Sequence, residues 1–225
     1  MELSVLKVVY RKDIIKRTFF CCLIMSISMA CNNKQRVLPF YNSPDFTAEW
    51  IKPNDTNYSS IHTIDTFSLM NQLGHTITKD SLDGNIYVAN FFFTSCTSIC
   101  PKMVNNLQYL QDTFAENKDF KLVSFTVTPE EDSVEILKNY GEIHSVNPSK
   151  WYLLTGNKDE IYKLGRKSYF AEKELGLKKD STEFLHTESM LLIDKKGRIR
   201  GIYNATDKVD IKRAIDDVRT LLSDE

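Results

Sequence analysis

The chain has 225 residues, of which 42% are hydrophobic and 26% are charged, and its formal net charge is −1 at pH 7. This size and composition fit one ordinary globular domain with an appendage. Because the charge is near zero and no basic run exceeds a short pair, we expect no nucleic-acid partner.

The first thirty residues are typical of an export signal. Basic residues up to Arg17 precede an uncharged, mostly apolar run from Thr18 to Ala30, thirteen residues long. A spanning helix needs about 20 apolar residues, whereas a basic start, a short apolar run and a small final residue describe a secretion signal. Ala30-Cys31 resembles a bacterial lipoprotein cleavage site. We therefore expect residues 1–31 to be the signal, Cys31 to be lipidated, and the domain to be exported, anchored to the cell membrane and facing the periplasm.

Residues 32–60 contain several prolines and many Asn and Ser, with little periodicity. This composition predicts a tether in the first part, and Val37 to Trp50 are expected to form a first edge element lying on the domain. The folded domain itself is expected over residues 61–225. It begins with two short strands within residues 67–77, on either side of a turn at Gly74.

The centre of the sequence is an apolar strand followed by two thiols and a helix. The run from Tyr87 to Phe93 is rich in aromatic and β-branched residues, which predicts a buried central strand. Pro101 is expected at the first helical position, because its missing N–H would have no intrahelical partner there. That position puts Cys100 at the N-cap and Cys96 in the loop before it.

Strands and helices then alternate to the end of the chain. The helix after the thiols is expected to continue to about Asn117 and to bury Met103, Leu107, Leu110 and Phe114. Asp132 with Glu135 resembles an N-cap with its capping partner. Further strands are expected at residues 120–127, 151–154, 189–193 and 198–203, and further helices after Asp132 and at 158–168 and 208–223. This order predicts an α/β, thioredoxin-like (peroxiredoxin-like) three-layer domain with a mixed central sheet flanked by helices and an N-terminal strand extension.

The cysteines of the folded part form one site. The export signal contains Cys21, Cys22 and Cys31, so only Cys96 and Cys100 remain in the folded part. Two cysteines four residues apart do not make a disulfide scaffold. A helix N-terminus favours the thiolate, the form that attacks disulfides and binds metals. Residues one helical turn apart have Cβ atoms about 5–6 Å apart, and a disulfide needs about 3.5–4.5 Å, so the spacing allows a bridge without imposing it. A metal tolerates the wider gap, and thiolates select Cu(I) or zinc.

A third metal ligand would come from one of four histidines. His186 lies just before the strand at 189–193, in the segment that passes beside the thiol loop in thioredoxin-like domains. A lone histidine before a strand is more often structural or solvent-facing, so its position alone leaves both interpretations open. His62, His75 and His144 lie near predicted turns and are expected on the surface.

Several motifs occur together from about Phe67 to the end of the last helix. They are Phe67-x-Leu69, Asn71-Gln72-x-Gly74, Phe92-x-Thr94-x-Cys96-x-x-x-Cys100-Pro101, the Pro129-Glu130-x-Asp132 turn, and His186 before Ile193-Asp194-x-x-Gly197. In these motifs the chain resembles the SCO/SenC family of copper-binding assembly factors for cytochrome c oxidase. The resemblance implies a thioredoxin-like fold in which Cys96, Cys100 and His186 bind one copper ion, as Cu(I) or Cu(II).

The resemblance also implies a function and partners. The family is implicated in maturing the dinuclear copper site of cytochrome c oxidase subunit II, so the expected partners are that subunit, a copper donor protein and the membrane. Two positions depart from the family pattern: many members carry Asp where this chain has Thr128, and Asp directly before the ligand His, where it has Leu185. A carboxylate that accepts a hydrogen bond from a ligating imidazole orients the ring, so the loss of that carboxylate can weaken Cu(II) binding.

Alternative chemistries remain for the two thiols. The leading hypothesis is a copper metallochaperone, which is a binding protein rather than an enzyme. The second is a thiol–disulfide oxidoreductase, with Cys96 as the attacking and Cys100 as the resolving catalytic thiol. Such enzymes usually carry two residues between the cysteines, and usually a proline where His186 lies. A peroxidase is a third possibility, but it would need a cationic group that activates one cysteine, and no Arg lies near the motif in the sequence. Zinc in place of copper is less favoured, because structural zinc usually takes four protein ligands and only three are predicted here. Met103 is a further soft donor, for which core packing is the preferred interpretation.

Overall fold

The computed structural model describes residues 36–171 and 188–223. The chain divides into two compact units, residues 1–36 and 37–225, and the architecture below is that of the second unit. Within the described ranges, no helix combines the length and apolarity that crossing a membrane requires. The predictions for Cys31 and His186 fall outside the described residues.

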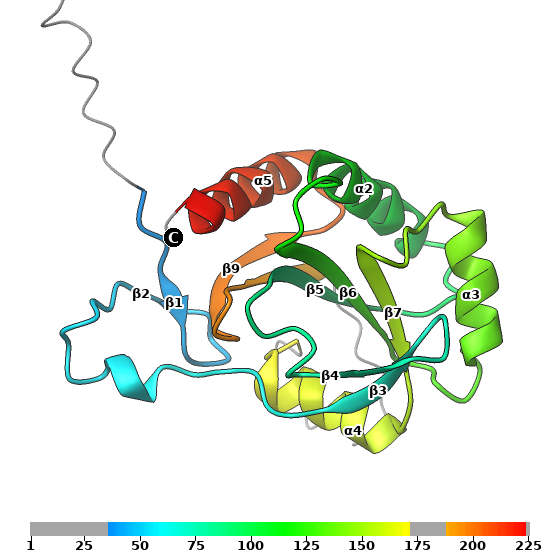
Figure 1. Ribbon diagram of the computed structural model, residues 1–225, viewed down its shortest axis with the longest axis horizontal. Coiled ribbons are helices and arrows are strands. Elements are labelled where there is room, and N and C mark those ends of the chain that lie inside the picture. The colour runs from blue at the N-terminus through cyan, green and yellow to red at the C-terminus, as the bar shows by residue number, and fades with distance from the viewer. Residues whose placement is uncertain (1–35, 172–187, 224–225) are drawn as a thin grey trace, which may run out of the picture. The chain divides into compact units, whose positions relative to one another are not determined.

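The second unit is built on a seven-stranded mixed sheet of order β4-β3-β7-β6-β5-β8-β9 (Figure 1). The three central strands β5, β6 and β7 run parallel, and the outer strands pair antiparallel. A separate two-stranded sheet pairs β1 with β2. The strands are β1 (Phe40–Tyr41), β2 (Ala48–Glu49), β3 (Ser68–Asn71), β4 (Thr76–Thr78), β5 (Ile86–Phe92), β6 (Phe120–Thr126), β7 (Trp151–Thr155), β8 (Ser189–Ile193) and β9 (Ile199–Asn204).

Helices cover both faces of the large sheet, which makes three layers (Figure 1). The described helices are α2 (Cys100–Thr113), α3 (Val134–Ile143), α4 (Lys158–Lys163) and α5 (Lys208–Ser223), with a 3-10 turn η1 (Tyr58–Ser60) and a π-helical turn η2 (Leu164–Ser168). Every residue of β5 is buried, and its side chains alternate between two hydrophobic clusters. Val88 packs with α2, α3 and α5, whereas Ala89 packs with α4 and η2. The predicted thioredoxin-like, mixed α/β architecture is confirmed.

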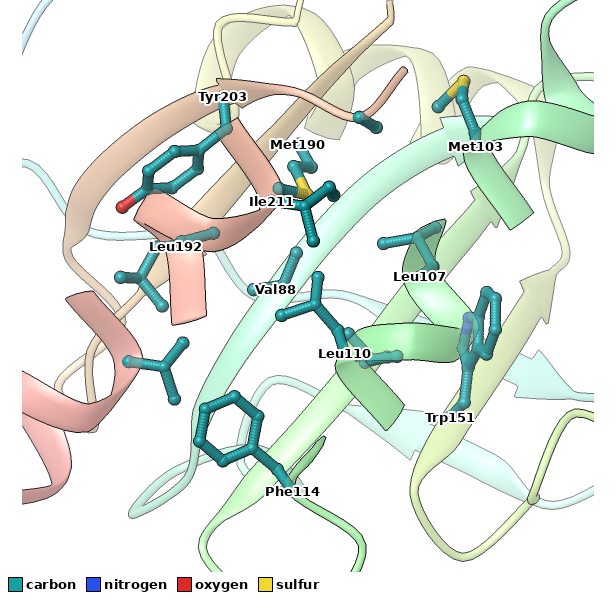
Figure 2. Close-up of a cluster of buried hydrophobic side chains, with 14 of the residues drawn as sticks. Val88, Met103, Leu107, Leu110, Phe114, Trp151, Met190, Leu192, Tyr203 and Ile211 are labelled. Carbon is teal, nitrogen blue, oxygen red and sulfur yellow. The ribbon is translucent and has the colours of Figure 1, made fainter. Parts of the chain in front are cut away.

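The cluster beneath α2 follows the predicted helical spacing (Figure 2). Leu107 and Leu110 face Val88 of β5 and Trp151 of β7, and Leu110 is fully buried. Met103 is 1% exposed and packs in the same cluster, so its interpretation as a core residue is confirmed. The buried face of α2 thus fixes the helix whose first turn carries Cys100.

The ends of α2 differ from the prediction. The helix begins at Cys100, so the N-cap is Ile99, whose carbonyl accepts the first helical hydrogen bonds, from Lys102 and Met103. It ends at Thr113 instead of about Asn117, because Phe114 leaves the helical region with φ −114°. Pro101 lies in the first turn, as expected.

One further helix is confirmed in its extent, and another is capped by a different residue than predicted. The helix predicted over residues 158–168 is present, but it changes at Leu164 from α-helix to a π turn, in which the Tyr169 N–H reaches back five residues to the Leu164 carbonyl. The N-cap of α3 is Ser133, whose side chain accepts from the Ile136 N–H. Asp132 is instead 1% exposed. It is therefore a buried residue of the domain and caps no helix.

An N-terminal strand extension is present, as predicted, and one arginine fastens it to β9. The Arg200 guanidinium donates to the Leu38 carbonyl at 2.6 Å and to the Pro39 carbonyl at 2.9 Å. It also lies 4.0 Å from the centre of the Phe40 ring, a cation–π contact. On its other side it contacts the buried Asp194 carboxylate at 3.2 Å. These contacts attach the first described strand to the body of the domain.

Candidate metal centre

The thiol loop begins where the central strand ends. The Val127 N–H donates to the Phe92 carbonyl at 2.9 Å, which extends the β5–β6 pairing by one step. The chain then turns, with the Cys96 N–H donating to the Phe93 carbonyl at 3.3 Å. Residues 97–99 lead directly into α2. The loop therefore carries Cys96 outward from a buried strand, while Cys100 enters the helix.

The two thiols lie side by side in different environments. The Cys100 N–H donates to the Cys96 Sγ at 3.4 Å, and the Ser98 hydroxyl lies 3.8 Å from the same sulfur. Both cysteines are free thiols; Cys96 is partly exposed, whereas Cys100 is 3% exposed. This places one accessible and one covered sulfur at the same helix N-terminus.

These environments move the two pKa values in opposite directions. Partial burial opposes ionisation of Cys96, but hydrogen bonds from Cys100 and Ser98 outweigh it and lower the pKa of this thiol to about 7. Burial raises the pKa of the Cys100 thiol to about 12, and its hydrogen bond with Cys96 acts in the same direction. Near neutral pH about half of the chains therefore hold a Cys96 thiolate beside a Cys100 thiol. Cys100 would lose its proton on binding a metal ion or on forming a disulfide bond.

An apolar rim surrounds the sulfurs. Phe93, Ile99 and Tyr140 are partly buried and pack against the same cluster as Cys100. Burial raises the pKa of Tyr140, and negative charge on the two cysteines raises it further. Tyr140 belongs to α3, which packs against β7 and β3. Its ring reaches the end of β5, where it lies 5.5 Å from that of Phe92.

The structure describes two of the three predicted metal ligands. Among the described residues, no three His, Cys, Asp or Glu side chains lie close enough together to hold a metal ion. Cys96 and Cys100 are brought together as predicted, and His186 lies outside the described ranges. Two sulfur donors, a partly exposed one on the loop and a buried one in the first turn of α2, suit a soft ion such as Cu(I).

The described histidines have other roles. His75 is exposed, as predicted. His62 is half-buried instead: its Nε2 contacts the Ser168 carbonyl at 2.8 Å, and its ring lies 4.5 Å from that of Phe170. His144 is also half-buried, with its ring 4.3 Å from that of Tyr140. These two side chains are partly rather than fully exposed. His62 packs on Phe170, which is far from it in the sequence, whereas His144 packs on Tyr140, which lies one helical turn before it.

A thioredoxin-like domain with an exposed and a covered thiol at a strand-to-helix junction defines a class of proteins that handle soft metals or disulfides. Within that class, the sequence profile of the SCO1/SenC family matches residues 55–223. The chain belongs to this family. It is 31% identical over 159 residues to the SCO1 protein homolog of Bacillus subtilis, covering 70% of this chain and 81% of that one.

Solved structures agree with this assignment. BsSco, described as a member of the Sco family of cytochrome c oxidase assembly proteins with a disulfide switch, is 28% identical, with a TM-score of 0.61 over 73% of this chain and 96% of its own. A SCO1/SenC family lipoprotein from Bacillus anthracis is 29% identical, with a TM-score of 0.63 over 77% and 100%. ScoI of Arabidopsis thaliana with copper bound is 27% identical, with a TM-score of 0.55 over 70% and 97%.

Proposed function

We propose that this protein is a copper metallochaperone that carries one copper ion on Cys96, Cys100 and His186 and assists maturation of the dinuclear copper site of cytochrome c oxidase subunit II. The observation that carries the proposal is the pair of free thiols at the start of α2, one of them accessible. Copper is the cargo of this site. A donor protein would supply it, and the oxidase subunit would receive it.

The donor set fits the proposed cargo. Thiolates select Cu(I), and an added imidazole also permits Cu(II). Cys96 lies in a loop and Cys100 in a helix, so one ligand can move while the other stays fixed. A site with three ligands leaves room for a partner's ligand to approach the ion before Cys96 releases it. Transfer by ligand exchange needs this accessibility.

The sheet topology supports His186 as the third ligand. Strand β8 pairs antiparallel with β5, and Met190 lies opposite Asn90. The residues just before β8 are therefore carried toward the end of β5 where the thiol loop starts. Glu188 is held there by the Ala205 N–H, which donates to its carbonyl at 2.7 Å. His186 is two residues from Glu188, a span of at most about 7 Å.

The proposed location follows from the N-terminal sequence. Cleavage before Cys31 and lipidation of that residue would anchor the domain to the membrane on the outer side, with residues 32–60 as tether and edge extension and 61–225 as the copper-binding domain. The lipoprotein relative from Bacillus anthracis supports this arrangement.

Copper binding to the reduced full chain tests the proposal. We expect one tightly held copper ion per chain, measured by metal analysis after competition with a Cu(I) chelator. Cys96→Ser and His186→Ala should each lose the ion or weaken its binding about 100-fold or more, because each removes a direct ligand. His75→Ala is the matched control, since His75 is exposed and distant in sequence from the thiols.

The ligand set would be wrong if His186→Ala bound copper like the wild type. The chaperone function would be wrong if the loaded chain failed to transfer copper to the reduced soluble domain of subunit II. That transfer is measured from the absorption of the acceptor's dinuclear site.

A second function, thiol–disulfide exchange, is favoured by the opposite pKa shifts of the two cysteines. The Cys96 thiolate would attack a disulfide of a partner, forming a mixed disulfide and releasing one partner thiolate. Cys100 would lose its proton and displace the second partner sulfur, leaving a Cys96–Cys100 disulfide and a reduced partner. The disulfide switch described for BsSco supports this alternative.

The two functions predict different behaviour of His186→Ala. A metallochaperone loses copper in this variant, whereas a thiol oxidoreductase still reduces an oxidised subunit II domain. Counting free thiols on the acceptor after mixing with the metal-free chain distinguishes them.

A further inference from the structure

Asp132 is a buried acidic residue next to the thiol loop. It follows the β6 strand in a turn, where its N–H and that of Glu131 both donate to the Thr128 carbonyl at 2.9 Å. Its side chain does not reach solvent, since the residue is 1% exposed. A buried carboxyl group is costly unless hydrogen bonds satisfy both oxygens, so its contacts indicate what it holds in place.

Three threonines and one backbone amide surround this carboxyl group. Oδ2 accepts from the Thr94 N–H at 3.2 Å and from the Thr128 hydroxyl at 3.1 Å. The Thr94 hydroxyl donates to Oδ1 and the Thr126 hydroxyl to Oδ2. Because the Thr126 oxygen also accepts from the Thr128 N–H at 3.1 Å, its own proton is directed at Asp132. The network joins the turn after β6 to the residue that follows Phe93.

Thr94 is the point at which this network meets the thiol loop. It lies two residues before Cys96, inside the turn closed by the bond from the Cys96 N–H to the Phe93 carbonyl. Both its backbone and its side chain are bound to Asp132. The loop is therefore fixed at one end by Asp132 and at the other by the first turn of α2. Residues 95–99, between these ends, carry Cys96.

We propose that Asp132 is a positioning residue for Cys96: it holds the first end of the thiol loop, so that Cys96 can leave and regain copper while the rest of the site stays in place. The proposal deepens the proposed function and rests on it for the role of copper. The loop-holding part depends only on contacts between described residues and can be tested without metal.

The test compares Asp132→Asn with the wild-type full chain in the reduced state. An amide in place of the carboxyl turns one acceptor oxygen into a donor facing other donors. In the metal-free chain, we expect faster hydrogen exchange at the Cys96 and Cys100 amides. It is read by mass spectrometry on peptides spanning residues 92–103. With copper, we expect an affinity loss of about 10- to 100-fold, as found when groups that orient a ligand are removed.

Asp194→Asn is the matched control. Asp194 is also a buried aspartate with several hydrogen bonds, accepting from the N–H groups of Lys196 and Arg198 and from the guanidinium of Arg200. It follows Ile193, which pairs with Tyr87 at the far end of β5, about 20 Å from the thiol loop. This variant should lower the melting temperature and leave exchange in the loop and copper affinity unchanged.

Substitutions of Thr94 keep the proposal testable if Asp132→Asn does not fold. Thr94→Val removes the hydroxyl with little change of shape and should reproduce part of the loosening, whereas Thr94→Ser should behave like the wild type. The proposal is overturned if exchange at Cys96 and Cys100 is unchanged in Asp132→Asn and Thr94→Val, or if Asp194→Asn loosens the loop equally. If the wild-type chain binds no copper, the chaperone function is overturned. If the loop of that metal-free chain still exchanges faster in Asp132→Asn, Asp132 remains the residue that holds the loop.

Discussion

The difference in pKa between the two thiols predicts that iodoacetamide will modify Cys96 and leave Cys100 unmodified. In the reduced, metal-free chain at pH 7, a thiol with a pKa of about 7 is half ionised, against about 1% for the ordinary value of 9.0. This gives about 50-fold more thiolate. A less basic thiolate is also less nucleophilic, by about tenfold over two pKa units, so Cys96 should react with iodoacetamide about five times faster than an ordinary thiol. Cys100, with a pKa of about 12, should stay unmodified in the folded chain.

Mass spectrometry of the digested chain, after short exposures to reagent between pH 5 and 9, measures both rates. The rate at Cys96 should rise with pH to a plateau, with a midpoint near 7, because only the thiolate reacts. Ser98→Ala should move the midpoint upward, since the Ser98 side chain lowers the pKa of Cys96. A midpoint near 9, or equal modification of Cys100, would refute the account of the site's electrostatics.

Two further predictions concern stability. Arg200→Gln should lower the free energy of unfolding by about 3 kcal/mol, because it leaves the buried Asp194 carboxylate with one ionic partner fewer and frees two carbonyls of the N-terminal extension. Limited proteolysis should then cut within residues 37–60, and an uncut extension would contradict its attachment through Arg200. Leu110→Ala should lower the free energy of unfolding by about 2–5 kcal/mol, since Leu110 is 0% exposed. Its control is Ile143→Ala, at a side chain that is 77% exposed, which should change this free energy by no more than about 0.5 kcal/mol. Urea denaturation measures the free energy of unfolding of each variant, and equal effects of Leu110→Ala and Ile143→Ala would show that the core beneath α2 is misassigned.

The local sequence pattern was sufficient to predict β5 and α2, the two elements that position the thiols. An unbroken apolar run predicted β5, and the spacing of Met103, Leu107 and Leu110 predicted the buried face of α2. Pro101 located the start of the helix to within one residue. These features depend on neighbours in the sequence, so they can be read from it.

The surroundings of the thiols could not be predicted in the same way. Asp132 was expected to cap α3, because an acidic residue after a turn usually does so. Its burial depends on Thr94, which lies 38 residues away and comes close only when β5 and β6 pair. Tyr140 reaches the thiols for a similar reason, since α3 must first pack against β7 and β3 before the Tyr140 ring can contact Phe92. His186, the proposed third ligand, was identified from a family resemblance and not from its spacing.

The ligand set of the bound copper is the central claim, and X-ray absorption spectroscopy of the copper-loaded chain tests it most directly. The account predicts a copper ion surrounded by two sulfur atoms and one imidazole nitrogen, from Cys96, Cys100 and His186. The imidazole contribution should disappear in His186→Ala and persist in His75→Ala. A spectrum with two sulfurs and no imidazole in the wild type, or one that His186→Ala leaves unchanged, would contradict the three-ligand site.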